Sequence, residues 1–362
     1  MVSNSKIKNI VWNWHKNIDE FEVANEIGFD LLPGCKINNS PRKKTKTRDD
    51  EFNVVIVDHF FYKGNINKKN IKQDYSWADL VIHYTREIII GPWEHYQKTI
   101  IENFNNTNFI TVCNGVVGMP DYPRERVYMD AQTFFTRIAR YGSVMKLEQA
   151  NNTKPMMFDA LLGKKNTGRD KLFNLFKENN LLDNNLVNYY DEIDKDATTL
   201  YRSPELDRID TNPITGFSAR AVKPGGVPRS HIIDQGIYDN TWFSVVAETR
   251  SGTTFITEKT TKCLLSGRMF VLFGEKGHLA KLRSYGYKTF GSHIDESYDD
   301  IEDENERIKA AFTQVNLLTQ RKDLAVIMQD LHSTFVHNQN LCLENIDRLE
   351  KLKSFLLPHV TG

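Results

Sequence analysis

The residues best suited to chemistry lie between two apolar runs in the second half of the chain. Thr257, Glu258 and Lys259 open a segment of helical pattern that follows the run Trp242–Ala247 and precedes the run Met269–Phe273. Both runs have the β-branched and aromatic content of buried strands. The Thr257 hydroxyl is suited to cap the helix, and Gly267 is suited to stop it. The order strand, helix, strand is typical of a parallel sheet, whose loops gather at one edge.

This corner of the sheet carries the groups that a nucleotide needs. A helix N-terminus offers free backbone N–H groups and the positive end of the helix dipole, which both favour phosphate. The Lys259 ammonium adds a positive charge, and the Glu258 carboxylate can accept hydrogen bonds from a ribose diol. The alternative interpretation is an ordinary exposed helix, in which Glu and Lys are common residues of the first turn.

The same segment resembles the donor-binding motif of the α1,3-fucosyltransferases. In that family a strand ends in a Glu, and a loop leads to a hydrophobic-Thr-Glu-Lys sequence and a further strand. The matching residues are Glu248, Ile256–Lys259 and Val271–Gly274. The resemblance implies that Glu258 holds the nucleotide ribose and that Lys259 contacts the diphosphate. It covers roughly the second half of the chain and is specific over about thirty residues. GDP-fucose is the donor that it suggests.

A second basic loop precedes this unit. The run Leu161–Arg169 follows a predicted strand, leads into a predicted helix and combines two glycines with Lys164, Lys165 and Arg169. Its spacing does not fit the Walker pattern, so it does not indicate an ATPase. The fucosyltransferase family has an Arg at this place that reaches the donor diphosphate, and Arg169 matches it. We assign Lys164 and Arg169 to the donor site, with a basic helix start on the surface as the alternative.

An inverting sugar transfer also needs a base that takes the proton of the acceptor hydroxyl. In a protein of two facing α/β domains, we expect this base at strand ends of the N-terminal domain. The catalytic candidates are Asp58, Glu87 and Glu94, and His15 and His83 are further acid–base groups there. Each could instead be a salt-bridged or capping residue.

The sequence predicts no metal site and no cofactor. Asp194-Lys-Asp196 matches the Asp-x-Asp of metal-dependent glycosyltransferases, but one polar loop rarely supplies the converging oxygens that a hard cation needs. Positive charge on the departing diphosphate would take the role of the metal. The four cysteines have no Cys-x-x-Cys spacing, and no hydrolase, zinc-protease or dinucleotide motif is present. The acidic run Asp295–Glu306 lacks the EF-hand pattern and is expected to be solvated.

Two α/β domains are expected, because a 362-residue chain with 40% hydrophobic residues can bury two cores. Residues 1–150 are assigned to an acceptor-side domain and residues 151–330 to the nucleotide-sugar domain, followed by C-terminal helices over residues 331–362. The polar run Glu148–Lys154 is the expected linker. The predicted fold is therefore two Rossmann-like parallel-sheet domains facing a cleft, the outline of a GT-B glycosyltransferase.

Individual elements follow from the hydrophobic periodicity. The predicted strands are Ile10–Trp12, Val54–Asp58, Leu80–His83, Phe109–Cys113, Met157–Leu162, Leu186–Tyr190, Trp242–Ala247 and Met269–Phe273. The predicted helices are Asp19–Ile27, Trp93–Phe104, Asp130–Arg140, Arg169–Asn179 and His278–Tyr285, with a helical pattern over residues 305–356.

Charge and hydropathy restrict the partners. Lys and Arg number 47 and so do Asp and Glu, and this balance argues against a dedicated DNA-binding protein. No run is apolar enough for a signal peptide or a membrane span, so a cytoplasmic protein is expected. The sequence predicts a metal-independent glycosyltransferase that moves a sugar from a nucleoside-diphosphate sugar to a saccharide or glycan acceptor. Two alternatives stay open: a phage-type enzyme acting on modified DNA, and a non-catalytic nucleotide- or glycan-binding protein.

Overall fold

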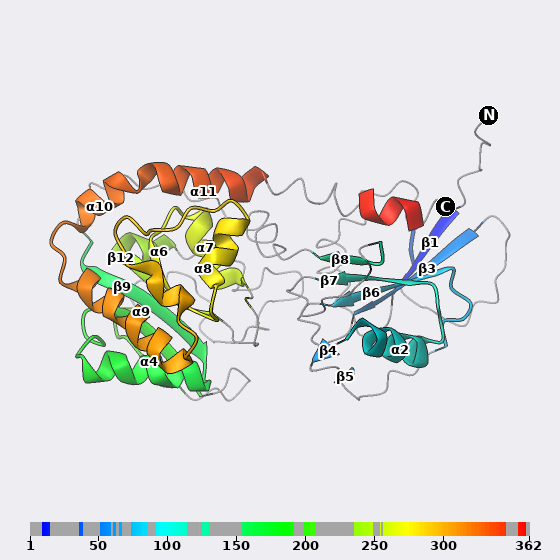
Figure 1. The fold of residues 1–362 in the computed structure, drawn as a ribbon, viewed down its shortest axis with the longest axis horizontal. Coiled ribbons are helices and arrows are strands. Elements are labelled where there is room, and N and C mark those ends of the chain that lie inside the picture. The colour runs from blue at the N-terminus through cyan, green and yellow to red at the C-terminus, as the bar shows by residue number, and fades with distance from the viewer. Residues whose placement is uncertain are drawn as a thin grey trace. The chain divides into compact units, whose positions relative to one another are not determined.

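The computed structural model describes residues 9–14, 36–38, 51–58, 61–62, 65–66, 74–85, 92–113, 123, 125–129, 154–191, 199–206, 235–248, 254, 256–344 and 354–359. The chain divides into two compact units, Met1–Thr133 with Asp347–Gly362, and Phe134–Ile346 (Figure 1). The predicted domain limit at residue 150 and the predicted helices Asp19–Ile27 and Asp130–Arg140 lie outside the described residues.

The first unit contains a six-stranded sheet in which every pair of neighbours is parallel. Its order is β2 (Lys36–Asn38), β1 (Asn9–Trp14), β3 (Glu51–Asp58), β6 (Leu80–Thr85), β7 (Phe109–Cys113) and β8 (Val127–Met129). The four strands predicted for this region are confirmed. The edge strands β2 and β8 were not predicted, and neither was the short antiparallel pair β4 (Phe61–Tyr62) and β5 (Asn65–Ile66).

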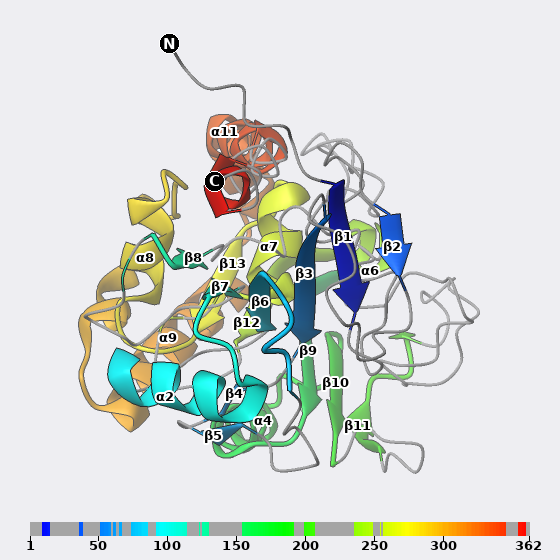
Figure 2. The same cartoon turned by 90° about the vertical axis from the view of Figure 1, so that its right-hand side faces the viewer.

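One helix of this unit, α2 (Trp93–Phe104), has the bounds predicted from its periodicity. Its buried stripe of Trp93, Tyr96, Ile100 and Phe104 packs on the sheet, and the Trp93 ring stacks on Phe109 of β7 with 6.0 Å between centroids. Figure 2 shows the strands β2, β1 and β3 of this sheet side by side. Spacing of three and four residues thus places one face of α2 in the core.

The second unit has a five-stranded sheet of order β11-β10-β9-β12-β13. Its strands are β9 (Met156–Lys164), β10 (Leu186–Tyr190), β11 (Thr199–Arg202), β12 (Thr241–Ala247) and β13 (Phe270–Phe273). The four predicted strands are confirmed and run parallel. The edge strand β11 was missed and is antiparallel to β10. Such an edge strand is common on an otherwise parallel sheet.

Helices surround this second sheet. They are α4 (Thr167–Glu178), α6 (Gln235–Asn240), α7 (Glu258–Leu265), α8 (His278–Ser284), α9 (Glu304–Thr319), α10 (Leu324–Asp330) and α11 (His332–Glu344), with a 3-10 turn η3 at Glu296–Asp300. α4 and α9 pack together through the Phe176 and Phe312 rings, 5.9 Å apart, and the Phe158 ring of β9 lies 5.2 Å from Phe176. None of the helices that the structure describes is both long and apolar enough to cross a membrane.

The register of the parallel strands gives the second sheet two distinct edges. Ala247 pairs with Phe273 at the carboxyl ends of β12 and β13, while Thr241 pairs with Met156 at the amino ends of β12 and β9. Loops that follow the strands therefore meet at the carboxyl edge, where ligands of open α/β sheets bind. The predicted α/β class with parallel sheets is confirmed.

Candidate functional site at the carboxyl edge of the second sheet

The start of α7 lies at this edge, as the sequence predicts. The Thr257 hydroxyl accepts a hydrogen bond from the Lys259 backbone N–H at 3.4 Å, so Thr257 is the N-cap. Glu258 and Lys259 occupy the first turn, and their side chains are about one-fifth exposed, at 21% and 22%. Sequence spacing alone sufficed here because an N-cap depends on residues within one turn.

Glu248, directly after β12, fills the N-terminus of this helix. Its Oε1 accepts from the backbone N–H of Thr257 at 3.0 Å, from that of Thr260 at 3.3 Å and from the Thr260 hydroxyl at 2.6 Å. Its Oε2 accepts from the Thr257 hydroxyl. The expectation of free N–H groups for phosphate at the start of α7 is therefore wrong for these groups, because a buried carboxylate already uses them. The structure gives Glu248 the role of holding α7 against β12.

Arg169 lies in the first turn of α4, the helix that follows β9, and its side chain reaches the same edge. Its backbone N–H donates a hydrogen bond at 2.9 Å to the side-chain oxygen of Asn166, which is the N-cap of α4. Gly163 has a φ of +70°, a conformation that favours glycine, and a Cβ there would lie 3.7 Å from the Arg169 Nη1. The Gly163 backbone therefore lies close to the guanidinium, which contacts the ends of β9 and β12 through the Lys164 and Ala247 carbonyls.

The Arg169 guanidinium is held by carbonyl groups. Nη1 donates to the Lys164 carbonyl at 2.7 Å and Nη2 to the Ala247 carbonyl at 3.3 Å. The buried Nε has no hydrogen-bond partner among the residues that the structure describes. Only 8% of the residue is exposed. Burial lowers the pKa of Arg169, and the carboxylates of Glu248 and Glu258 oppose that shift. A guanidinium nevertheless keeps its proton in proteins, so a buried positive charge stands at this edge.

Glu258 and Lys259 form an ion pair beside it. The Lys259 Nζ lies 3.0 Å from the Glu258 Oε1 and 3.2 Å from the Thr257 hydroxyl. Burial by itself raises the pKa of Glu258, but the positive charges of Lys259 and Lys262 outweigh it and lower that pKa to about 2. Glu258 is therefore an ionised acceptor at any physiological pH, which suits a pair of hydroxyl groups.

We call the residues that converge here the carboxyl-edge site: Lys164, Arg169, Glu248, Glu258 and Lys259. The Lys164 side chain is exposed, and its carbonyl holds Arg169. These five charged residues are all predicted donor residues. The sixth predicted donor residue, Thr257, lies beside them as the N-cap of α7. Together they can offer cations to a diphosphate and a carboxylate to a diol.

The predicted catalytic candidates belong to the first unit. Asp58 is the last residue of β3, opposite Tyr84, and Glu94 is an exposed residue in the first turn of α2. Asp58 thus lies at the carboxyl end of its strand, and Glu94 lies in the helix that comes after β6 in the chain. Glu87 and His15 lie outside the described residues. His83 is buried in β6, where its Nδ1 contacts the Tyr96 hydroxyl, so its ring belongs to the core.

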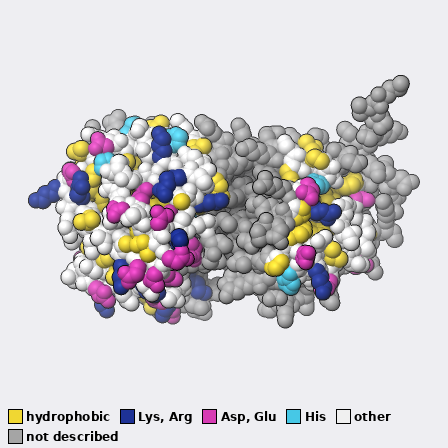
Figure 3. All heavy atoms as spheres, viewed as in Figure 1, with side chains coloured by type: hydrophobic (Ala, Val, Ile, Leu, Met, Phe, Trp, Pro, Cys, Tyr) yellow, Lys and Arg dark blue, Asp and Glu magenta, His cyan; other side chains and the backbone are white. Residues whose placement is uncertain are grey.

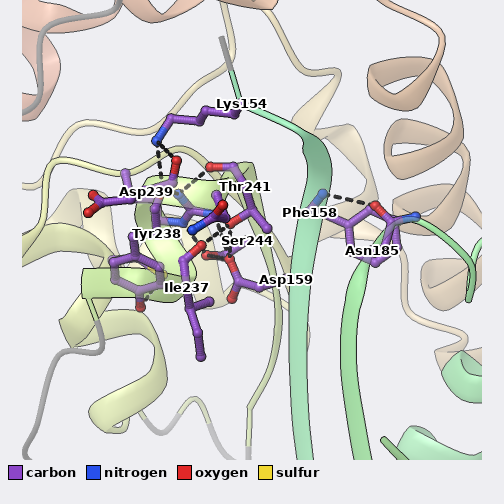
Figure 4. Close-up of polar contacts among 12 residues, drawn as sticks. Lys154, Phe158, Asp159, Asn185, Ile237, Tyr238, Asp239, Thr241 and Ser244 are labelled. Atoms are coloured by element: carbon purple, nitrogen blue, oxygen red, sulfur yellow. Dashed lines mark hydrogen bonds and ion pairs between the residues drawn. The ribbon is translucent and has the colours of Figure 1, made fainter. Parts of the chain in front are cut away.

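A second cluster of charges lies at the opposite, amino edge of the second sheet. Asp159 of β9 accepts hydrogen bonds from the hydroxyls of Thr241 and Ser244 at 3.1 and 2.9 Å, as Figure 4 shows. Arg268 forms a buried ion pair with it at 2.5 Å and donates to the Thr241 carbonyl at 2.8 Å. Because these buried groups satisfy one another, the cluster is structural and fixes the starts of β9, β12 and β13.

The acidic run Asp295–Glu306 includes exposed carboxylates such as that of Glu302, and Figure 3 shows acidic side chains gathered on one face of the second unit. The expectation that it is solvated is wrong for Asp299, which is 3% exposed. Its carboxylate accepts from the backbone N–H groups of Leu279 and Ala280 at 3.0 and 2.9 Å, and so caps α8. Sequence could not show this, since the capped helix lies about twenty residues earlier in the chain.

Among the described residues, no three His, Cys, Asp or Glu side chains converge as a metal site would require. The Asp194-Lys-Asp196 segment lies outside those residues. Metal independence stays a prediction.

Comparisons with known proteins add a likeness of fold. No protein-family model matches the sequence, and no curated protein matches it significantly. The structure is similar to that of an α1,3-fucosyltransferase, with 11% identity and a TM-score of 0.48 over 100% of this chain and 92% of that chain. It is also similar to an α1,3-fucosyltransferase with GDP (12% identity, TM-score 0.45, 100% and 93% covered). A third similar structure is T4 phage BGT in complex with UDP and Mn²⁺ (10%, 0.43, 98% and 99%). These similarities are similarities of fold, and they assign no function to individual residues.

Proposed function

We propose that the protein is a glycosyltransferase that binds a nucleoside-diphosphate sugar at the carboxyl-edge site and passes the sugar to a saccharide acceptor. The diphosphate contacts Arg169 and Lys259, and the ribose diol binds the Glu258 carboxylate. GDP-fucose is the donor suggested by the resemblance of the Glu248–Lys259 segment to the α1,3-fucosyltransferases. The transfer proceeds without a metal ion.

One observation carries this proposal, namely the buried guanidinium of Arg169. The residues that the structure describes provide it with carbonyl partners but with no carboxylate at ion-pair distance, and its Nε has no acceptor. A buried charge is costly unless it is paired. An anionic ligand at this edge would supply the missing acceptor, and the neighbouring Lys259 adds a second cation for the same diphosphate.

The same residues account for the chemistry of the leaving group. When the bond between the sugar and the diphosphate breaks, negative charge grows on the diphosphate oxygens. Arg169 and Lys259, fixed before the reaction by the contacts described above, stabilise that charge without reorganisation. The proton of the acceptor hydroxyl passes to a carboxylate of the first unit, for which Asp58, Glu87 and Glu94 are the candidates.

Nucleotide binding is the first test. Thermal-shift measurements with GDP, UDP, CMP and their sugars should show one nucleotide family that stabilises the protein, by about 2.7 kcal/mol at 100 times its dissociation constant. Lys259→Ala should weaken that binding by about 1.5–3 kcal/mol, since it removes a hydrogen bond to a charged group. Lys276→Ala is the matched control, because Lys276 is an exposed lysine of the same unit that pairs with Glu302.

The outcomes separate the proposal from its alternatives. Equal calorimetric affinity for Lys259→Ala and wild type would contradict the assignment of Lys259. Binding without transfer or donor hydrolysis over a broad acceptor panel would favour a non-catalytic binding protein. An acceptor complex that weakens steeply with salt would favour modified DNA, because phosphate contacts release counterions.

A further inference from the structure

His278 is a buried histidine, and within the described part of the chain neither of its ring nitrogens has a hydrogen-bond partner. It is the first residue of α8 and is only 1% exposed. A buried imidazole normally donates through one nitrogen and accepts through the other. Polar groups left without partners inside a protein are rare and destabilising, so a ring with two of them calls for an explanation.

The ring lies beside the carboxyl-edge site. The Glu248 backbone N–H donates to the Phe273 carbonyl at 3.0 Å, which places Glu248 next to Gly274, the first residue after β13. A Cβ on Gly274 would lie 2.5 Å from the His278 Nδ1. The imidazole therefore lies on the backbone at the end of β13, in a space that exists because Gly274 has no side chain.

The backbone around this ring is firmly held, so the missing partners do not reflect a loose segment. The Gly277 backbone N–H donates to the Asp299 carbonyl at 2.8 Å, and the Asp299 carboxylate caps α8. Arg307 donates to the Gly274 carbonyl at 3.2 Å and to the Ile301 carbonyl at 2.6 Å. By contrast, the His278 imidazole forms no hydrogen bond with any residue that the structure describes.

Burial lowers the pKa of His278, while the nearby carboxylates of Glu248, Asp299 and Glu275 oppose that shift. A neutral imidazole offers one donor and one acceptor, and it suits an uncharged group that can do both. Hydroxyl groups of a sugar and the amide edge of a nucleobase share this chemistry. A phosphate group only accepts hydrogen bonds, so it could pair with the imidazole N–H but not with the accepting nitrogen.

We propose that His278 is a further donor-binding residue, whose imidazole hydrogen-bonds an uncharged polar group of the nucleotide sugar. The inference rests on the proposed function, because it assumes a nucleotide sugar at the carboxyl edge. With His278 included, the carboxyl-edge site covers the carboxyl end of β13 as well as those of β9 and β12. Since the ring is covered in the ligand-free chain, its contact with the donor requires a local displacement of the groups that cover it.

The test compares His278→Leu with wild type by calorimetry, using a nucleoside diphosphate and the corresponding nucleotide sugar. His278→Leu should weaken binding about 3- to 10-fold, the usual effect of one or two neutral hydrogen bonds. His278→Gln, which keeps a donor and an acceptor, should recover part of the loss. A loss already seen with the diphosphate assigns the contact to the nucleoside, and a loss seen only with the nucleotide sugar assigns it to the transferred sugar.

Stability of the ligand-free protein separates a binding role from a structural one. His278→Leu removes two unsatisfied polar atoms, so the melting temperature should stay the same or rise. His332→Leu, at an exposed histidine of α11, is the control for both measurements. Unchanged affinity of His278→Leu for every ligand, together with a loss for Lys259→Ala, would overturn this inference alone. Absence of binding by the wild-type protein would overturn the proposed function with it.

Discussion

Removal of the Glu248 carboxylate should detach the start of α7 from the sheet. Glu248→Ala leaves two backbone N–H groups and two hydroxyl groups without their acceptor. The hydroxyls of Thr257 and Thr260 can rotate toward other acceptors, so the N–H groups dominate the cost. Two buried N–H groups that lose their acceptor cost about 2–6 kcal/mol. Breaking a buried charged pair typically costs about 3–5 kcal/mol, which lies within that range. We expect a loss of about 3–5 kcal/mol in the free energy of unfolding.

Glu248→Gln is the matched variant, because it changes the charge and keeps the shape. Three of the four hydrogen bonds go to Oε1, and an amide oxygen at that position still accepts them. The amide nitrogen replaces Oε2 and can donate to the Thr257 hydroxyl. Charged acceptors are worth about 1–2 kcal/mol more than neutral ones, so Glu248→Gln should cost about that amount.

Thermal unfolding, followed by calorimetry and circular dichroism, measures both losses. For a unit of the size of Phe134–Ile346, 1 kcal/mol corresponds to about 2–4 °C in Tm. The transition of this unit should fall by about 6–20 °C in Glu248→Ala and by about 2–8 °C in Glu248→Gln. Glu302→Ala, at a side chain that is 85% exposed, should change Tm little. A Tm of Glu248→Ala equal to that of wild type, or equal losses in the two variants, would refute the capping role.

Three further predictions concern the site and its chemistry. Turnover should survive EDTA, whereas a loss that Mn²⁺ or Mg²⁺ restores would point to a metal at Asp194–Asp196. Among Asp58→Asn, Glu87→Gln and Glu94→Gln, the variant that removes the true base should lower kcat about 10²–10⁴-fold with donor affinity nearly intact. If none of the three variants lowers kcat in this way, the base is another residue. Because the pKa of Glu258 is lowered from 4.5 to about 2, its contribution to stability is present above pH 4.5 and is lost as the pH falls toward 2. Acid unfolding of Glu258→Gln should therefore begin from a lower stability and depend less on pH in that window, and an unchanged pH profile would contradict the lowered pKa.

Local sequence patterns determined most of the elements near the site. The bounds of α2, the N-cap at Thr257 and the strand before Glu248 were all predicted, because each depends on residues within one or two turns or on one run of apolar side chains. The edge strand β11 was missed, because four residues without clear alternation carry too little signal. Its identity as a strand comes from pairing with β10.

The sequence also determined which residues gather at the carboxyl edge, because parallel strands bring their following loops together. It could not show what each residue contacts. Glu248 fills the N-terminus of α7, Arg169 donates to the Ala247 carbonyl 78 positions away, and the ring of His278 lies over Gly274. A sequence shows that helix N–H groups and a guanidinium exist, whereas tertiary packing decides which partner comes within about 3 Å of them. Only the structure therefore separates the residues that hold this edge together from those left with unsatisfied groups for a ligand.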